Sequence, residues 1–180
     1  MHEGDGLPGF PSVDVFIYLV NPQLEKLRDP ALELIQDSYS QLEQIASSIV
    51  EKIFQRFPTM IPTIMDIIIQ CLNKERDHAR EIVEAIIDSE QNYLFTNDRD
   101  YKDNRSDIVT GDNQPGQPQQ VQQRSANPFV SEMRKRIDAY FDIVLRTVRD
   151  SIPKAIGYFL VKKSQDVLQF ELYNQVNSNP

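Results

Sequence analysis

The chain has 180 residues, of which 40% are apolar and 26% are charged, and we expect one domain with room for a sizeable core. The 27 acidic residues outnumber the 19 basic ones and give a formal charge of −8. Such a chain is a poor match for a phosphate backbone, so we expect no nucleic-acid partner.

The first segment, residues 1–12, holds three glycines and two prolines and is predicted to be a loop. It has neither the basic region nor the apolar core of a signal peptide. After it, apolar residues advance by three and four positions from Phe16 to Phe57, which predicts a long amphipathic helix over residues 13–57. Pro22 and Pro30 should each start, kink or interrupt that helix.

Pro58 and Pro62 predict the turn into a second long helix, whose apolar stripe runs from Ile64 to Leu94. Its first part, TIMDIIIQCL, is apolar around more than half of the helix and is expected to contact more than one neighbour. Residues 73–84 are strongly charged and are predicted to be solvated. The only cysteine, Cys71, lies in the apolar part, which excludes an intrachain disulfide and favours a buried side chain in a reducing compartment.

Residues 98–127 are rich in Gln, Asn, Asp, Gly and Pro and are predicted to be a disordered linker. Helical periodicity returns over residues 128–176, with a kink or break expected at Pro153, and residues 177–180 form a polar tail. No apolar run is long enough to span a membrane. The predicted fold is therefore all-α, an elongated antiparallel bundle formed by a long helical hairpin (13–97), the linker and the returning helices.

The run RKRIDAYFDIVLRTVRDSIPKAIGYFLV, residues 134–161, resembles the GTPase effector domain of the dynamin superfamily. Three further patches are similar to parts of the stalk in that family: LPGF at residues 7–10, PQLEKLRDPAL at 22–32 and IIDSEQNYLFTNDRDY at 86–101. They occur in the order of the family and cover most of the chain outside the linker. The resemblance implies the later part of a dynamin-like or Mx-like stalk, with the middle domain before the linker and the effector domain after it.

The sequence contains no GxxxxGK[ST] motif, which would cradle the phosphates of a nucleotide. A GTPase domain, a first stalk helix and the helix that follows the effector domain are also expected to be absent from it. We therefore expect no catalytic residue and no cofactor in this chain, with GTP and magnesium belonging only to a full-length parent. The chain is expected to be a fragment or a naturally short product.

The resemblance places a self-association surface at Tyr158, Phe159 and Val161, where dynamin stalks cross in a symmetric dimer. The alternative is that these side chains only fill the core. The resemblance also gives an assembly role to the first loop, through Gly4, Gly6, Leu7, Pro8, Gly9 and Phe10. The alternative for that loop is a flexible chain end.

Two chemical interpretations find little support in the sequence. Glu75 and His78 have the spacing of a di-iron ligand pair, but His2 is the only other histidine, so no metal site is expected. Neither His78 nor Cys71 has a partner that would make it a nucleophilic centre. The linker occupies the position at which dynamins carry a lipid-binding domain, but its aspartates outnumber its basic residues, so membrane contact is expected to be indirect.

Two functions remain open. The first is a self-assembling stalk segment that, in an intact large GTPase, mediates oligomerisation for membrane remodelling such as organelle division or vesicle scission. The alternative is a stand-alone helical module that docks on a full-length dynamin-like protein and regulates it. The expected location for either is the cytoplasm, peripheral to organelle or vesicle membranes.

Overall fold

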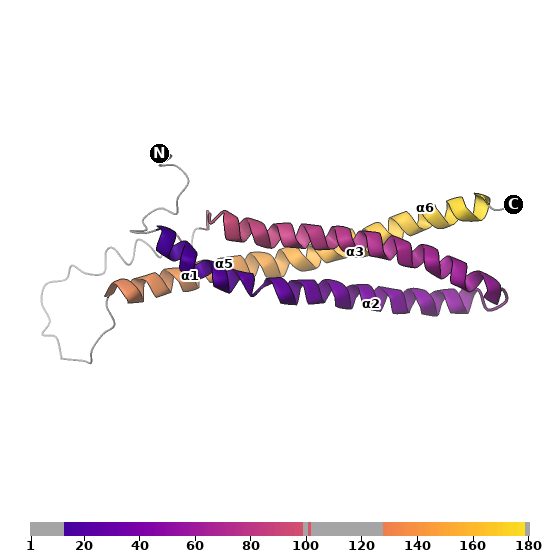
Figure 1. The fold of residues 1–180 in the computed structure, drawn as a ribbon, viewed down its shortest axis with the longest axis horizontal. Coiled ribbons are helices and arrows are strands. Elements are labelled where there is room, and N and C mark those ends of the chain that lie inside the picture. Colours follow the sequence, from indigo (N-terminus) through magenta and orange to yellow (C-terminus); the bar gives the residue numbers. More distant parts are fainter. Residues whose placement is uncertain (1–12, 99–100, 102–127, 179–180) are drawn as a thin grey trace, which may run out of the picture. The chain divides into compact units, whose positions relative to one another are not determined.

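The structure is a computed structural model, and it describes residues 13–98, 101 and 128–178. Every regular element in these residues is a helix: α1 (Val13–Glu25), α2 (Arg28–Ile53), the short 3-10 helix η1 (Pro58–Met60), α3 (Ile61–Asn92), α5 (Pro128–Ala155), the π-helical segment η2 (Ile156–Lys162) and α6 (Lys163–Ser178) (Figure 1). The predicted all-α class is confirmed. Among the described helices, none combines the length and the apolar character needed to cross a membrane.

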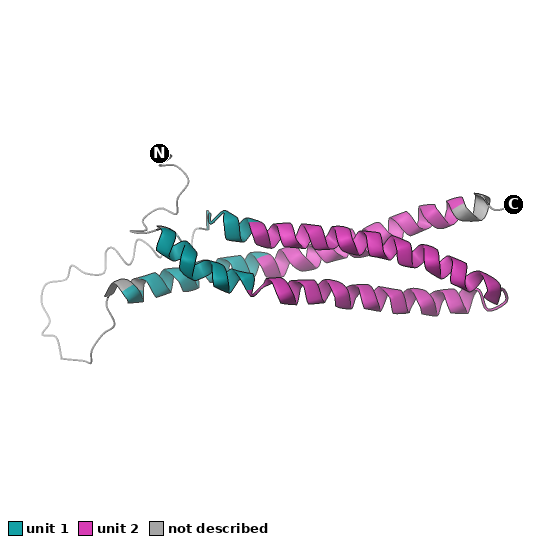
Figure 2. Ribbon diagram, in the orientation of Figure 1, with its two compact units in different colours: residues 1–25, 89–147 teal, residues 26–88, 148–180 magenta. Residues whose placement is uncertain are grey.

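The helices belong to two compact units (Figure 2). Unit 1 comprises residues 1–25 and 89–147, and unit 2 comprises residues 26–88 and 148–180. The loop predicted for residues 1–12 lies outside the described residues, as does most of the linker predicted for residues 98–127.

Unit 1 is built on the buried faces of α1 and of the first part of α5. Phe16 and Tyr140 meet edge to face with ring centroids 5.5 Å apart, and both side chains are fully buried. Two described residues of the predicted linker contact α5 in this unit. Asp98 pairs with Arg146 of α5 at 3.3 Å, and the ring of Tyr101 lies 6.3 Å from that of Tyr140.

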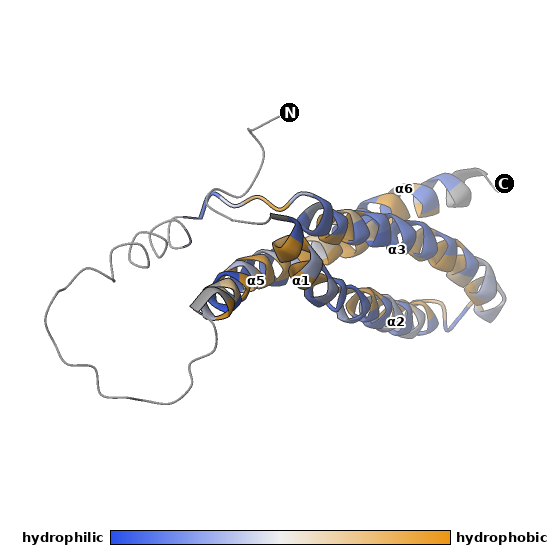
Figure 3. Cartoon of the chain, turned by 60° about the vertical axis from the view of Figure 1, so that its left-hand side comes forward, coloured by the Kyte–Doolittle hydropathy of each residue, from blue (hydrophilic) through white to orange (hydrophobic). Residues whose placement is uncertain are grey.

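Unit 2 contains the hairpin of α2 and α3, which run antiparallel on either side of η1, together with the end of α5, η2 and α6 (Figure 1). Figure 3 shows hydrophobic and hydrophilic stretches alternating along α2 and α3, as expected for amphipathic helices. The apolar core of this unit is formed by Ala31, Ile35, Tyr39, Val50, Ile64, Ile68, Cys71, Leu72, Ala79, Val83, Ile87, Val148, Ile152, Ala155, Ile156 and Leu160.

Prolines mark the beginning of α2, η1 and α3, whereas Pro22 lies inside α1, which continues to Glu25. The single helix predicted for residues 13–57 is interrupted by a turn at Lys26 and Leu27, and α2 starts at Arg28. Pro30 lies in the first turn of α2, where a backbone N–H would have no helical partner in any case. The turn predicted at Pro58 and Pro62 is confirmed, with Pro58 opening η1 and Pro62 in the first turn of α3.

Candidate self-association surface

The backbone of η2 is the irregular part of the returning helices. The sequence predicted a kink or break at Pro153, but the helix continues through it to Ala155 and becomes π-helical from Ile156 to Lys162. The N–H of Lys163 donates to the carbonyl oxygen of Tyr158, five residues earlier, as a π-helix requires. Because π-helical turns inside α-helices occur frequently at functional sites, the backbone of η2 is itself an indication of a functional site.

The side chains of η2 divide into a buried and an exposed set. Ile156 and Leu160 fill the core of unit 2. Tyr158 remains 52% exposed and Val161 41% exposed, whereas Phe159 is half-buried. The three predicted interface residues therefore include two that present apolar surface to solvent and one that packs within the unit.

Phe159 is held between two aromatic neighbours. Its ring centroid lies 5.0 Å from that of Tyr158 and 5.1 Å from that of His78 of α3, both in edge-to-face geometry. The ammonium group of Lys163 lies 5.7 Å from the centre of the Tyr158 ring. These contacts fix the orientation of the exposed Tyr158 ring, which lowers the conformational entropy that it would lose on binding a partner.

The structure also locates the residues considered for metal binding and catalysis. His78 Nδ1 lies 4.0 Å from a carboxylate oxygen of the buried Glu75. No group of three His, Cys, Asp or Glu side chains suited to a metal ion occurs among the described residues. Cys71 is buried, and its thiol lies 3.9 Å from the carbonyl oxygen of Ser164. Burial, and then the negative charge of Glu75, raise the pKa of the Cys71 thiol, which keeps it protonated.

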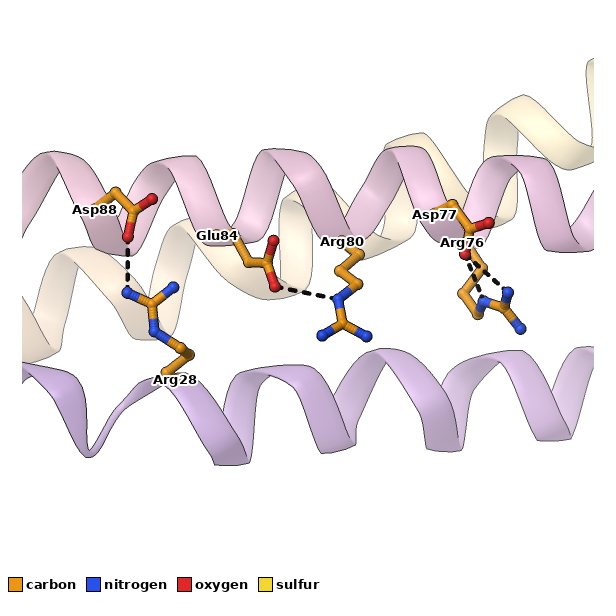
Figure 4. Close-up of polar contacts among 6 residues, drawn as sticks. All are labelled: Arg28, Arg76, Asp77, Arg80, Glu84 and Asp88. Carbon is orange, nitrogen blue, oxygen red and sulfur yellow. Dashed lines mark hydrogen bonds and ion pairs between the residues drawn. The ribbon is translucent and has the colours of Figure 1, made fainter.

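A seam of charged side chains lies on the facing sides of α2 and α3 (Figure 4). Arg28 of α2 pairs with Asp88 of α3 at 2.7 Å, and Arg80 pairs with Glu84 along α3 at 3.1 Å. Arg76 contacts Asp77 and also stacks over the ring of Tyr39 at 4.9 Å. Each of these arginines has a carboxylate partner, but only the pair of Arg28 and Asp88 joins the two helices.

Part of the apolar stripe of α2 is left exposed to solvent, which the sequence did not predict. The exposed members are Leu34, Ile45, Ile49 and Ile53. These side chains were assigned to the buried stripe, but they are 43%, 55%, 51% and 65% exposed, respectively. The predicted assembly loop, Gly4 to Phe10, lies outside the described residues.

Comparison with known proteins agrees with the resemblance seen in the sequence. Residues 1–109 match the family described as "Dynamin central region", and residues 125–180 match the "Dynamin GTPase effector domain". Similar proteins include the interferon-induced GTP-binding protein Mx of Ctenopharyngodon idella, which is 24% identical over 180 residues, covering 98% of this chain. Human interferon-induced GTP-binding protein Mx2 is 24% identical over 178 residues, covering 93% of the chain.

A relative with a different name matches over a similar extent. Vacuolar protein sorting-associated protein 1 of Schizosaccharomyces pombe is 22% identical over 222 aligned residues, again covering 93% of the chain. The chain spans only a part of these proteins, namely 27% of the Ctenopharyngodon idella protein, 25% of the human one and 33% of the yeast one. In this chain, the residues that match the relatives are those that match the dynamin central region and the dynamin GTPase effector domain.

Proposed function

The chain belongs to the dynamin superfamily, and from this membership we propose that it is a stalk segment through which a dynamin-like protein associates with copies of itself. The observation that carries the proposal is the exposed pair of Tyr158 and Val161 on η2, next to the braced ring of Phe159. Aromatic side chains with a fixed orientation are the residues that dominate the binding energy of protein interfaces.

The proposal extends to the role of such association in a full-length parent. The Mx proteins are named as GTP-binding proteins, and this chain lacks the phosphate-binding motif that GTP chemistry needs. In a full-length parent, a GTPase domain would hold GTP and magnesium, and the stalk would bring several such domains together for membrane remodelling. The segment itself would perform no catalysis and would contact a membrane only indirectly, from the cytoplasmic side.

Sedimentation velocity over a concentration series tests the proposal. The native chain is expected to show a dimer or a larger species, and Tyr158→Asp combined with Val161→Asp is expected to reduce it, because two charges would enter the contact. Both positions are exposed, so the double variant should retain its helical circular dichroism. Phe159 is left unchanged because its ring packs on His78 and its loss would disturb the fold.

Tyr18→Asp is the matched control. Tyr18 lies on α1 and is 78% exposed, so this variant adds one of the two charges at another solvent-facing tyrosine. It should sediment like the native chain. A native chain that stays folded and monomeric at every concentration would contradict the proposal, and so would a double variant that still associates as strongly as the native chain.

A second candidate function is supported by a hollow in unit 1. A cavity of about 350 Å³ lies between α1 and α5, lined by Val15, Leu19, Val130, Met133, Arg134 and Ile137. Its lining is apolar apart from Arg134, and apolar grooves between helices accept amphipathic helices of other proteins. This feature favours a module that docks on a full-length dynamin-like protein. In that case Leu19→Asp would abolish binding to the full-length protein without changing the sedimentation of the segment alone.

A further inference from the structure

The turn that joins α2 to α3 exposes large apolar side chains to solvent (Figure 1). Ile53 at the end of α2 is 65% exposed, Phe57 in the turn is 60% exposed and Met60 at the end of η1 is 45% exposed. Exposed turns are more often built from small and polar residues. We call residues 52–60 the hairpin tip, and its exposed apolar side chains indicate a contact surface.

The backbone of the hairpin tip bonds largely to itself. The N–H of Phe57 donates to the carbonyl oxygen of Phe54 at 2.8 Å, and the N–H of Met60 donates to the carbonyl oxygen of Phe57 at 3.0 Å. Pro58, which opens η1, has no backbone N–H to satisfy. These bonds lower the cost of bringing the turn against an apolar medium, in which an unpaired backbone group is expensive.

The charge of the hairpin tip is opposite in sign to that of the chain. The chain has a formal charge of −8, but between Glu51 and Asp66 it holds two basic residues, Lys52 and Arg56, and no acidic one. Both basic side chains are exposed. The carboxylate of Glu51 accepts a hydrogen bond from Ser47, one turn back along α2, at 3.2 Å. The tip is therefore a basic and apolar surface in an acidic chain.

We propose that the hairpin tip binds the surface of an anionic lipid bilayer. Phe57 and Ile53 would enter the interfacial region, where amphipathic surfaces bury their apolar side chains. Lys52 and Arg56 would lie at the headgroups, with their aliphatic stems along the apolar surface and their charges on anionic lipid.

The shape of the tip favours lipid over a protein partner. Its exposed side chains lie on the projecting end of a two-helix hairpin, which can enter a fluid interface (Figure 1). An amphipathic helix of another protein would instead need a groove between helices. An apolar anchor combined with nearby basic residues is the pair of signals that holds a protein at a membrane surface.

This inference goes beyond the proposed function, which gives the segment only an indirect contact with a membrane. The tip shares no residue with the η2 surface of Tyr158 and Val161, so one chain can use both. Two basic residues, each worth about a fivefold gain in affinity, and a few apolar side chains give weak binding for a single tip. Self-association would place several tips in one particle and raise the apparent affinity through multivalent contact.

Cosedimentation with vesicles tests the lipid contact. The native chain should bind vesicles of equal parts phosphatidylserine and phosphatidylcholine at least about tenfold more tightly than vesicles of phosphatidylcholine alone. Phe57→Ser should weaken binding to the mixed vesicles about tenfold, because it removes the largest inserted side chain. Lys52→Gln combined with Arg56→Gln should weaken it at least about tenfold. All three positions are exposed, so the variants should keep their helical circular dichroism.

Two matched controls separate the tip from general surface effects. Phe95→Ser removes a phenylalanine that is 63% exposed, but Phe95 follows the end of α3 whereas Phe57 precedes its start. Lys135→Gln combined with Arg149→Gln removes two exposed basic side chains of α5 and changes the net charge by the same amount as the tip variant. Both controls should bind the mixed vesicles like the native chain.

A tryptophan in the tip reports on insertion directly. The chain contains no tryptophan, so Phe57→Trp would carry a single indole. Its fluorescence should move to shorter wavelengths when the mixed vesicles are added, because the indole leaves water for the interface. Phe95→Trp should show no such shift.

The inference is overturned if the native chain does not bind the mixed vesicles, if the tip variants bind them as the native chain does, or if the Phe57→Trp emission stays unshifted on bound vesicles. A native chain that binds vesicles through the tip and stays monomeric upholds the inference and contradicts the proposed function. A chain that dimerises without binding vesicles does the reverse, and leaves the tip to a protein partner.

Discussion

Replacing Tyr140 by phenylalanine should stabilise unit 1. The ring of Tyr140 is fully buried between Phe16 and Tyr101, and its hydroxyl has no partner in hydrogen-bonding geometry among the described residues. Burial, the carboxylate of Glu90 and the phenol of Tyr101 raise the pKa of Tyr140. The backbone of Phe95 interacts with the hydroxyl and lowers this pKa in part, but the contact does not reach hydrogen-bonding geometry and therefore leaves the hydroxyl unsatisfied. Tyr140→Phe keeps both ring contacts and removes the buried polar atom.

The expected gain depends on pH in a defined direction. At neutral pH, removing an unsatisfied buried hydroxyl should raise the free energy of unfolding by about 1–2 kcal/mol. In the unfolded chain Tyr140 ionises near pH ~10, whereas its pKa in the folded unit is higher. Above that pH the unfolded state loses a proton that the folded state keeps, so the native chain loses up to about 1.4 kcal/mol per pH unit. The phenylalanine variant has no such loss at this position, and its advantage should therefore grow.

Urea unfolding followed by circular dichroism from pH 7 to pH ~11 measures both effects. Tyr18→Phe is the control, since Tyr18 is exposed and its replacement should change stability by less than about 0.5 kcal/mol. A Tyr140→Phe variant that is less stable than the native chain at pH 7 would refute the reasoning. It would show that the hydroxyl has a partner that stabilises the fold by more than the burial of the hydroxyl costs.

Two further predictions concern unit 2. Val83→Ala should lower the free energy of unfolding by about 2 kcal/mol, because Val83 is fully buried in α3. Val161→Ala, on the exposed part of η2, should lower it by less than about 0.5 kcal/mol. Chemical denaturation compares the two variants, and equal losses would mean that Val161 belongs to the core. Cys71 should react with a thiol reagent at least about a hundredfold more slowly in the folded chain than in urea, since it is buried and its pKa is raised. A folded-state rate close to that in urea would show that this part of α3 opens readily.

Much of the helical fold could be predicted because the sequence repeats its apolar residues with the period of a helix. Phe16, Val20 and Leu24 of α1 were expected on the apolar stripe of one helix and Tyr140 and Val144 of α5 on that of another, and all five are buried. Prolines gave the turn between α2 and α3. The family resemblance gave the order of the segments, which periodicity alone does not contain.

Other features could not be predicted because they depend on what lies opposite a helix. Ile45, Ile49 and Ile53 continue the stripe of α2, yet no described helix covers them. Conversely, the charged stretch of residues 73–84 was expected to be solvated, but Glu75 is buried in it, beside Ala79 and Val83 of the predicted apolar stripe. Charge counts describe the average polarity of a segment, whereas burial follows the one face that meets a neighbour. Tyr158 and Val161 came from the resemblance, and their exposure could be established only with the structure.

The π-helical segment η2 also determines how α6, which follows it, is rotated about the helix axis. Each hydrogen-bonded ring there holds one residue more than in an α-helix. The residues of η2 therefore turn less about the helix axis, residue for residue, than those of a regular α-helix do. If one residue were lost from η2 and regular α-helical bonding ran through, α6 would turn by roughly 100° relative to α5. Half-buried residues such as Val167 and Leu168 would then exchange places with exposed ones such as Phe170. The length of this short segment thus decides which side of α6 is available to solvent.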